Sequence, residues 1–136
     1  MDTRRINEVY ANMADELIQE HGCFDHLRDA DITIIYLSST HAKKQGDKLV
    51  LGQCEKVAEK YKWGIPADFT ITVFEPNVVG FTEEQIKILL FHELLHVGYD
   101  PDTERQYIKP HDLEDFKLII DTYGTDWAKV DQPADI

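Results

Sequence analysis

Apolar side chains recur every three or four residues near the start of the chain. The positions are Ile6, Val9, Tyr10, Met13, Leu17 and Ile18. On a helix this spacing gathers the side chains on one face, which a folded protein buries. The pattern therefore predicts an N-terminal helix over residues 2–20, which Gly22 is expected to end.

Three later segments have strand-type patterns. Residues 31–37 are rich in β-branched and aromatic side chains, and Phe69–Phe74 alternates Phe, Ile and Val with Thr. Between them, a polar turn over residues 43–47 precedes residues 48–57, which open with Leu-Val-Leu and suit a strand, although residues 55–61 suit a helix equally well. We expect a small three-stranded sheet.

Two further helices are predicted after the strands. Thr82 and Gln85 have the spacing of a capping box, so a helix is expected over residues 82–97. Gly98 is expected to end this helix in a left-handed conformation, and a polar loop is expected to follow. A last amphipathic helix is predicted over residues 112–123. The order of elements predicts an α+β fold.

Length and composition favour one domain over residues 1–136, with its core at about residues 4–127 and a loose tail over residues 128–136. Of the side chains, 43% are hydrophobic and 29% are charged, which is the range of globular proteins. Cys23 and Cys54 are too far apart in sequence for a CxxC element, so we expect two reduced core thiols.

The charge of the chain restricts its partners and its location. Acidic residues outnumber basic ones 26 to 14, which argues against direct binding to nucleic acid or to anionic lipid. The first residues lack the apolar core of a secretory signal, and no apolar stretch is long enough to span a bilayer. We therefore expect no membrane association and a cytoplasmic location.

One motif carries candidate chemistry. His92-Glu93-Leu94-Leu95-His96 is an HExxH sequence within the helix predicted over residues 82–97. One helical turn separates the two histidines, so both imidazoles can reach the same metal ion, while Glu93 is rotated toward the open position of the metal. Glu93 therefore suits the role of general base in a zinc metallopeptidase.

A catalytic zinc site needs a third protein ligand. The extended metzincin motif is excluded, because it requires Gly and His where this chain has Tyr99 and Asp102. His111 is the best candidate, since it follows Pro110 at the opening of the last predicted helix, and Glu114 is its main rival. The remaining acidic candidates in range are Asp100, Asp102 and Glu104.

Other polar residues near the motif have simpler interpretations. Asp112 and Asp115 could orient a liganding imidazole, but acidic residues are also common in a first helical turn. Tyr99 and Tyr107 could donate to an oxyanion, although surface packing is the simpler interpretation. The remaining histidines lack ligand-like spacing and are expected to be solvated. They are His21, His26 and His41.

These residues resemble the putative phage metallopeptidases, a family related in outline to the SprT-like zinc peptidase domains. The resemblance spans residues 31–127. It rests on four segments: residues 67–69 at the strand, residues 81–85 at the helix start, the HExxH motif, and a second block at residues 111–116. Tyr123-Gly124 and Trp127 follow this second block. The second block is the more specific part, and it supports His111 over Glu114 as the third ligand.

The resemblance implies a compact zincin-like fold whose C-terminal helix supplies the third ligand, a phage or prophage origin in a host cytoplasm, and hydrolysis of a peptide or protein substrate. The SprT-like preference for proteins attached to DNA is not carried over, because this acidic chain lacks basic recruiting segments. We expect one Zn²⁺ per chain on His92, His96 and His111, with Glu93 as general base.

Two other hypotheses stay open at this stage. In the first, the zinc site is non-catalytic and the acidic surface engages a basic host protein, although Glu93 beside the metal argues against a purely structural site. In the second, the chain is an acidic interaction domain without metal. The zinc content of the purified protein separates the second from the other two.

Overall fold

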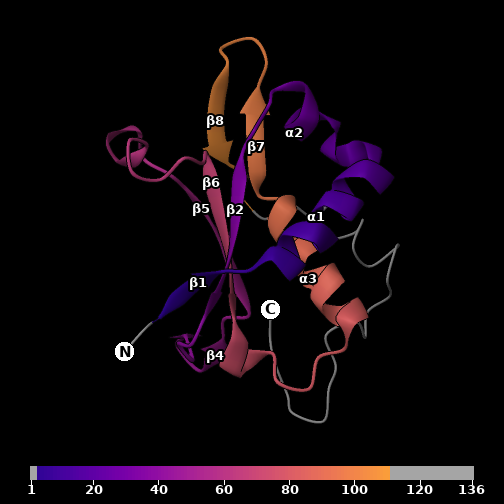
Figure 1. Cartoon of the computed structure of the whole chain (residues 1–136), viewed down its shortest axis with the longest axis vertical. Helices are drawn as coiled ribbons and strands as arrows, with labels where there is room; N and C mark the ends of the chain where they lie inside the picture. The colour runs from indigo at the N-terminus through magenta and orange to yellow at the C-terminus, as the bar shows by residue number, and fades with distance from the viewer. Residues whose placement is uncertain (1–2, 111–136) are drawn as a thin grey trace.

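The computed structural model describes residues 3–110 of the chain (Figure 1). Three α-helices lie in this part. They are α1 (Glu8–Glu20), α2 (Asp25–Asp29) and α3 (Glu83–Leu94). The strands are β1 (Arg4–Ile6), β2 (Ile34–Ser39), β3 (Lys44–Gln45), β4 (Lys48–Leu49), β5 (Gly52–Lys56), β6 (Phe69–Phe74), β7 (Val97–Asp100) and β8 (Arg105–Ile108). Short 3₁₀ turns are η1 (Gly22–Phe24), η2 (Glu59–Tyr61) and η3 (Glu75–Asn77). The α+β class is confirmed.

Four strands form one mixed sheet in the order β1-β2-β6-β5. β2 and β6 run parallel, with Ile34 opposite Phe69, whereas β1 and β5 are antiparallel to their neighbours. β6 is central and almost wholly buried, which explains its run of Phe, Ile and Val. The expected three-stranded sheet therefore has a fourth strand, β1, and β5 lies at the edge next to α3.

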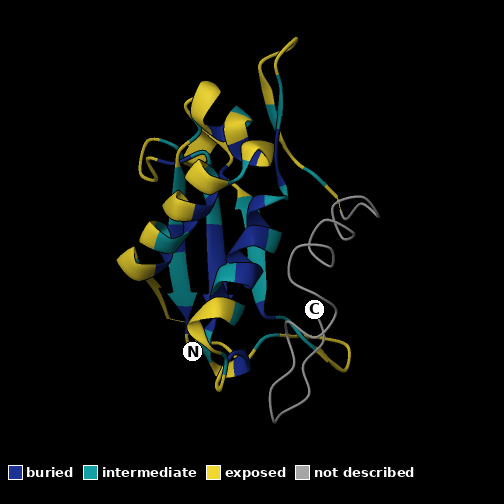
Figure 2. Cartoon of the chain, turned by 90° about the vertical axis from the view of Figure 1, so that its right-hand side faces the viewer, coloured by how far each residue is buried: buried dark blue, intermediate teal, exposed yellow. Residues whose placement is uncertain are grey.

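The three α-helices lie over the same face of the sheet, and the core fills the space between these layers (Figures 1 and 2). α1 contributes Ala14 and Leu17, while α3 contributes Leu90 and Phe91, all almost fully buried. Burying a leucine or phenylalanine side chain stabilises the fold by about 1.5–3 kcal/mol. This core supports the last turn of α3, where the HExxH motif begins.

The N-terminal helix is shorter than predicted. The side chain of Asn7 accepts a hydrogen bond from the backbone N–H of Tyr10 and so caps α1. The preceding residues pair with β2, with Ile6 opposite Leu37. The prediction that the helix starts at residue 2 was therefore wrong, because pairing with β2 satisfies this backbone instead.

Two hairpins accompany the main sheet. β3 and β4 are joined by a two-residue turn, in which Gly46 has a φ of +63°. This hairpin confirms the polar turn predicted over residues 43–47. The adjoining segment, left open between strand and helix, forms β4, β5 and the short turn η2.

The second hairpin replaces the polar loop that was expected after the HExxH helix. α3 ends at Leu94 rather than at residue 97, and β7 and β8 pair with Gly98 opposite Tyr107. A Cβ on Gly98 would lie 2.5 Å from Cε2 of Tyr107, so the tyrosine ring covers the glycine directly. Gly98 is thus a packing position in a strand, and its predicted role as a left-handed helix stop was wrong.

No helix in the described segment is long and apolar enough to cross a membrane. The helix predicted over residues 112–123 and the tail over residues 128–136 lie outside the described residues.

Candidate metal centre

The first two residues of the HExxH motif are fixed by a helix with a well-defined start. The side chain of Thr82 accepts from the N–H of Gln85 (3.2 Å), and the Gln85 side chain accepts from the N–H of Thr82 (2.8 Å), which completes the predicted capping box. Three turns later His92 and Glu93 lie in the last turn of α3. His96 follows one residue after the helix C-cap, Leu95.

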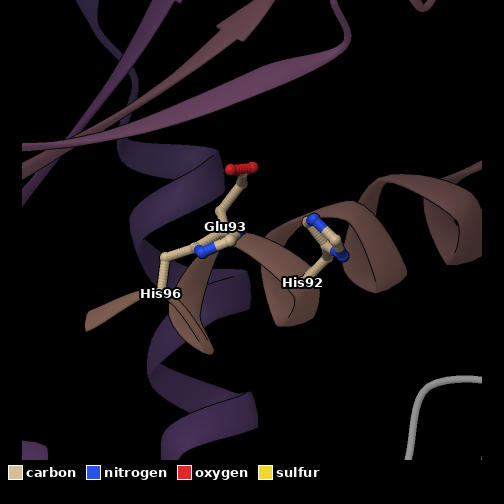
Figure 3. A group of neighbouring side chains, drawn as sticks. All are labelled: His92, Glu93 and His96. Atoms are coloured by element: carbon tan, nitrogen blue, oxygen red, sulfur yellow. The ribbon is translucent and has the colours of Figure 1, made fainter. Parts of the chain in front are cut away.

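The structure brings the three polar side chains of the motif together (Figure 3). One ligand atom from each of His92, Glu93 and His96 lies within 4.8 Å of the others. The two imidazole rings stand 5.1 Å apart between centroids at 76° to each other. Glu93 points away from the helix between the two histidines (Figure 3). The juxtaposition predicted from the spacing of the motif is therefore present.

His96 is oriented by the far end of the second hairpin. Its Nδ1 lies 2.7 Å from the carbonyl oxygen of Lys109, and because a carbonyl can only accept, Nδ1 must donate. The N–H of Lys109 in turn donates to the carbonyl oxygen of His96 (2.7 Å). In the neutral ring this leaves the lone pair on Nε2, which is the arrangement that a metal-binding histidine needs.

The side chain of Glu93 is buried, with only 4% of the residue surface exposed, although a glutamate in water is charged at neutral pH. Burial raises the pKa of Glu93 to about 8. A cation beside the carboxylate would oppose this effect, since an opposite charge favours the ionised form. The environment thus increases the proton affinity of Glu93, as a general base requires.

Gly52 makes room for the Glu93 carboxyl. A Cβ on this glycine of β5 would lie 3.3 Å from Cγ and 3.4 Å from Cδ of Glu93, and 3.3 Å from the carbonyl oxygen of Thr72. The two distances of 3.3 Å are tighter than ordinary van der Waals contact, and the distance of 3.4 Å is at its lower limit. The edge strand of the sheet therefore approaches the motif closely only because residue 52 has no side chain.

A cleft opens on both sides of Glu93 and His96. One part, of about 460 Å³, also reaches His92 and the β3–β4 hairpin, and the other, of about 480 Å³, reaches Cys54 and Ile108. Both parts are lined by Gln45, Val50, Gly52, Glu93 and His96. The cleft thus reaches all three polar side chains of the motif, with His92 and His96 half-buried and Glu93 buried.

The chemistry of the cluster fits a metal ion. Two imidazoles suit zinc and several other divalent metals, and two ligands of a tetrahedral zinc are about 3.3 Å apart. The separation of up to 4.8 Å between the ligand atoms is within a side-chain adjustment of this value. The donor set therefore fits a metal, and its identity as zinc is an inference from the ligand type.

The acidic candidates for a third ligand do not join the cluster within residues 3–110. Asp100 lies in β7, while Asp102 and Glu104 are exposed in the turn of the second hairpin. His111 and its rival Glu114 lie outside the described residues, as do Asp112 and Asp115. The described hairpin does lead the chain back to His96 through Lys109.

Other predictions for single residues had mixed outcomes. His41 is exposed as expected, but His21 packs on Phe91 and His26 donates from Nε2 to the carbonyl oxygen of Val97 (3.0 Å), so neither is simply solvated. Tyr99 and Tyr107 lie in paired strands rather than in a loop.

The two cysteines form no disulfide in the described part of the chain. Cys54 is half-buried, with its pKa raised mainly by burial, but Cys23 is exposed, so its assignment to the core was wrong.

Sequence reasoning missed Gly52 and Lys109 as parts of the site. Gly52 follows the Leu-Val-Leu run, and a glycine beside a strand can signal a close approach of another group. Lys109 gave no signal, because its backbone rather than its side chain makes the contacts.

Comparison with known proteins gives one match. The model of the putative phage metallopeptidase family covers residues 4–134, which is nearly the whole chain and includes the HExxH motif. No curated protein and no solved structure matches the chain significantly. The match of the family model shows that the chain belongs to the putative phage metallopeptidase family, and the cluster of His92, Glu93 and His96 agrees with it.

Proposed function

We propose that the protein is a zinc-dependent peptidase in which His92 and His96 bind the metal and Glu93 is the general base. The observation that carries the proposal is the position of Glu93, which is buried between two histidines at the floor of a cleft. A structural zinc site would need no such carboxylate and would close with a fourth protein ligand. Membership of a metallopeptidase family agrees with this assignment.

His111 is the third ligand in this proposal. The Lys109 backbone is held on His96 by two hydrogen bonds of 2.7 Å. His111 follows two residues later, so its Cα is within about 7.6 Å of the Lys109 Cα, whatever the conformation between them. A metal bound to His96 is therefore within reach of residue 111 along the chain, which favours His111 over Glu114, five residues after Lys109.

Zinc, when bound, supplies a Lewis acid that polarises the scissile carbonyl and increases the acidity of water. Glu93 accepts a proton from the attacking water on a carboxylate oxygen and then delivers this proton to the leaving amine as the C–N bond breaks. The Nδ1–H of His96 remains fixed on the Lys109 carbonyl throughout. Burial keeps bulk water from competing for the Glu93 proton.

The edge of β5 is the best binding site for an extended substrate. The N–H of Val57 donates to the carbonyl oxygen of Asp68, just before β6, and the carbonyl oxygen of Leu51 accepts from the N–H of Phe74, the last residue of β6. In an antiparallel pair the bonded positions alternate, so the backbone groups of the even-numbered residues of β5 point away from β6. These residues are Gly52, Cys54 and Lys56. A peptide paired with them would pass directly over the cleft, as β-strand addition allows.

Metal content and hydrolysis test the proposal together. Wild-type protein purified without chelator should hold one zinc per chain, and His92→Ala and His111→Ala should each lose most of it. His41→Ala is the matched control, because His41 is exposed and lies outside the cluster. Elemental analysis gives the metal content of each variant.

Glu93→Gln separates catalysis from metal binding. This variant should keep its zinc and lose peptide hydrolysis by roughly 10²- to 10⁴-fold, which is the usual contribution of a general base. Undiminished hydrolysis by Glu93→Gln would exclude the assigned base. Zinc-loaded wild-type protein that cleaves no peptide would instead favour the non-catalytic zinc-binding alternative.

A further inference from the structure

Three lysines surround the cleft above Glu93. Lys48 lines the part next to His92, and Lys43 and Lys44 line the part next to Cys54. Among residues 3–110, Glu93 is the one acidic side chain in the lining. We refer to Lys43, Lys44 and Lys48 as the lysine rim.

This rim is unusual for the chain that carries it. The protein has 26 acidic and 14 basic residues and a net charge of −12. The segment over residues 43–49 has three lysines and one acidic residue, Asp47, in a seven-residue stretch. At physiological salt, charges more than about 8 Å away are largely screened. A ligand inside the cleft therefore experiences the lysines of the lining more strongly than carboxylates beyond this distance.

The backbone of the rim is held in place by η3, the turn that follows β6. The side chain of Asn77, which is buried, donates to the carbonyl oxygens of Lys43 and Val50, both at 2.8 Å. The N–H of Val50 also donates to the Lys43 carbonyl (3.0 Å). These bonds close the base of the β3–β4 hairpin. Its lysines are thus presented at a fixed position beside the cleft, which lowers the entropic cost of binding.

The three lysines have different roles. Lys43 is half-buried, donates from Nζ to Oε1 of Gln53 and lies 5.5 Å from the ring centroid of Phe74. Lys44 and Lys48 are exposed, and neither forms an ion pair within residues 3–110. Lys43 therefore belongs to the support of the hairpin, while Lys44 and Lys48 are available to a ligand.

We propose that the cleft selects peptide segments with acidic side chains close to the bond to be cleaved, and that Lys44 and Lys48 contact these side chains. The proposal rests on the proposed function, since it names the substrate class of the same site. An acidic peptide fits better than nucleic acid, because a long phosphate backbone would extend beyond the rim onto a surface of net negative charge.

Binding to the zinc-loaded Glu93→Gln variant tests recognition without hydrolysis. Fluorescently labelled oligoglutamate and oligoglutamine peptides of equal length are the probes, and anisotropy gives their Kd values. Oligoglutamate should bind roughly 2- to 30-fold more tightly, which is the range that two exposed ion pairs can supply, and the difference should shrink as salt increases. Adding Lys44→Gln and Lys48→Gln should remove the preference.

Lys60→Gln is the matched control, because Lys60 is exposed in η2 and lines neither part of the cleft. It should leave the preference unchanged. A reversed pair, Lys44→Glu with Lys48→Glu, should favour oligolysine over oligoglutamate. Equal Kd values for oligoglutamate and oligoglutamine would overturn the proposal, as would tighter binding of oligothymidylate than of oligoglutamate.

Hydrolysis is measured separately, with two random peptide libraries that differ only in having Glu or Gln at the same positions. Faster cleavage of the Glu library by the wild-type protein, and loss of the difference in the Lys44→Gln, Lys48→Gln variant, would support the proposal. Cleavage of both libraries at equal rates would overturn the acidic preference and uphold the peptidase. Lysine-dependent binding of oligoglutamate without cleavage of either library would uphold recognition and contradict the peptidase.

Discussion

At the scale of single residues, the candidate site depends on a glycine at position 52, which has no Cβ. The carboxyl of Glu93 lies against the backbone of Gly52, where a Cβ would be 3.3 Å from Cγ and 3.4 Å from Cδ of Glu93. Any larger residue would meet both Glu93 and the Thr72 carbonyl. The position of the proposed base is thus set jointly by a helix and by the edge strand of the sheet.

Gly52→Ala should lower hydrolysis by at least about tenfold, because small displacements of a catalytic group cost that much or more. Zinc content should stay at the wild-type level, since His92 and His96 are not displaced. The loss should fall on kcat rather than on KM, which a general loss of folding would not produce. Steady-state kinetics and elemental analysis measure these quantities.

Gly64→Ala provides the control for the Gly52 variant, because a Cβ at Gly64 would have nothing within 4 Å. It should match the wild-type protein in both assays. A Gly52→Ala protein with an unchanged kcat would show that the close contact with Glu93 has no catalytic consequence.

The sequence was most informative at this scale. The HExxH spacing predicted the meeting of His92, Glu93 and His96, because the last turn of α3 and the turn that directly follows it determine this meeting locally. Gly52 and Lys109 were not recognised, because their contacts with the motif arise only when separate elements pack together. A single sequence carries little signal for contacts of this kind.

At the scale of elements, the β7–β8 hairpin is the support of the second histidine. β7 begins directly after His96, and β8 leads to Lys109, which bonds back to the same histidine. The sequence predicted a loop here, because Gly98 and Pro101 are common helix stops. The segment instead forms a hairpin, in which Gly98 pairs with Tyr107 and the tyrosine ring covers the glycine across the two strands.

Gly98→Ala should destabilise the protein by about 1–3 kcal/mol, the usual cost of overpacking, because the new Cβ would clash with the Tyr107 ring. It should also weaken zinc binding by about tenfold, since the displaced hairpin carries the Lys109 carbonyl that orients His96. Urea unfolding gives the first quantity, and competition with a metal chelator gives the second.

A double variant identifies the cause of this effect. Gly98→Ala should cost little when it is added to Tyr107→Ala, because the ring that the Cβ meets is then absent. If Gly98→Ala is equally harmful with and without the ring, the destabilisation has another origin and the packing argument fails.

At the scale of the whole molecule, the sheet joins parts that the sequence predicted separately. The strand patterns of β2 and β6 were recognised, but not that they pair in parallel, nor that β1 would add a fourth strand. Strand pairing is a long-range property, and β1 has only three exposed residues, so it lacks the alternation that marks a strand. The class of the fold was predictable, whereas its topology was not.

Asp68 connects several of these parts at the start of β6. Its carboxylate accepts from the N–H of Thr33 before β2 (2.9 Å), from Lys62 Nζ (3.1 Å), and from the Gln106 side chain in β8. Burial alone would raise the pKa of Asp68, but these three hydrogen bonds and the charge of Lys62 outweigh burial and lower the pKa below its ordinary value of 3.8. The folded state therefore prefers the ionised carboxylate.

Asp68→Asn should therefore destabilise the protein by about 1–3 kcal/mol near neutral pH, because hydrogen bonds to a charged acceptor are lost. A carboxylate whose pKa is lowered by folding stabilises the fold above its unfolded pKa, and this contribution disappears as the pH falls through the folded pKa. The difference in free energy of unfolding between wild type and variant should thus narrow below about pH 4, as urea unfolding across the acid range would measure.

Glu59→Gln is the control, because Glu59 contacts the same Lys62 but is 86% exposed. This substitution should change the free energy of unfolding little at any pH. A difference for Asp68→Asn that stays constant down to low pH would mean that the ionised carboxylate is not what holds these parts together.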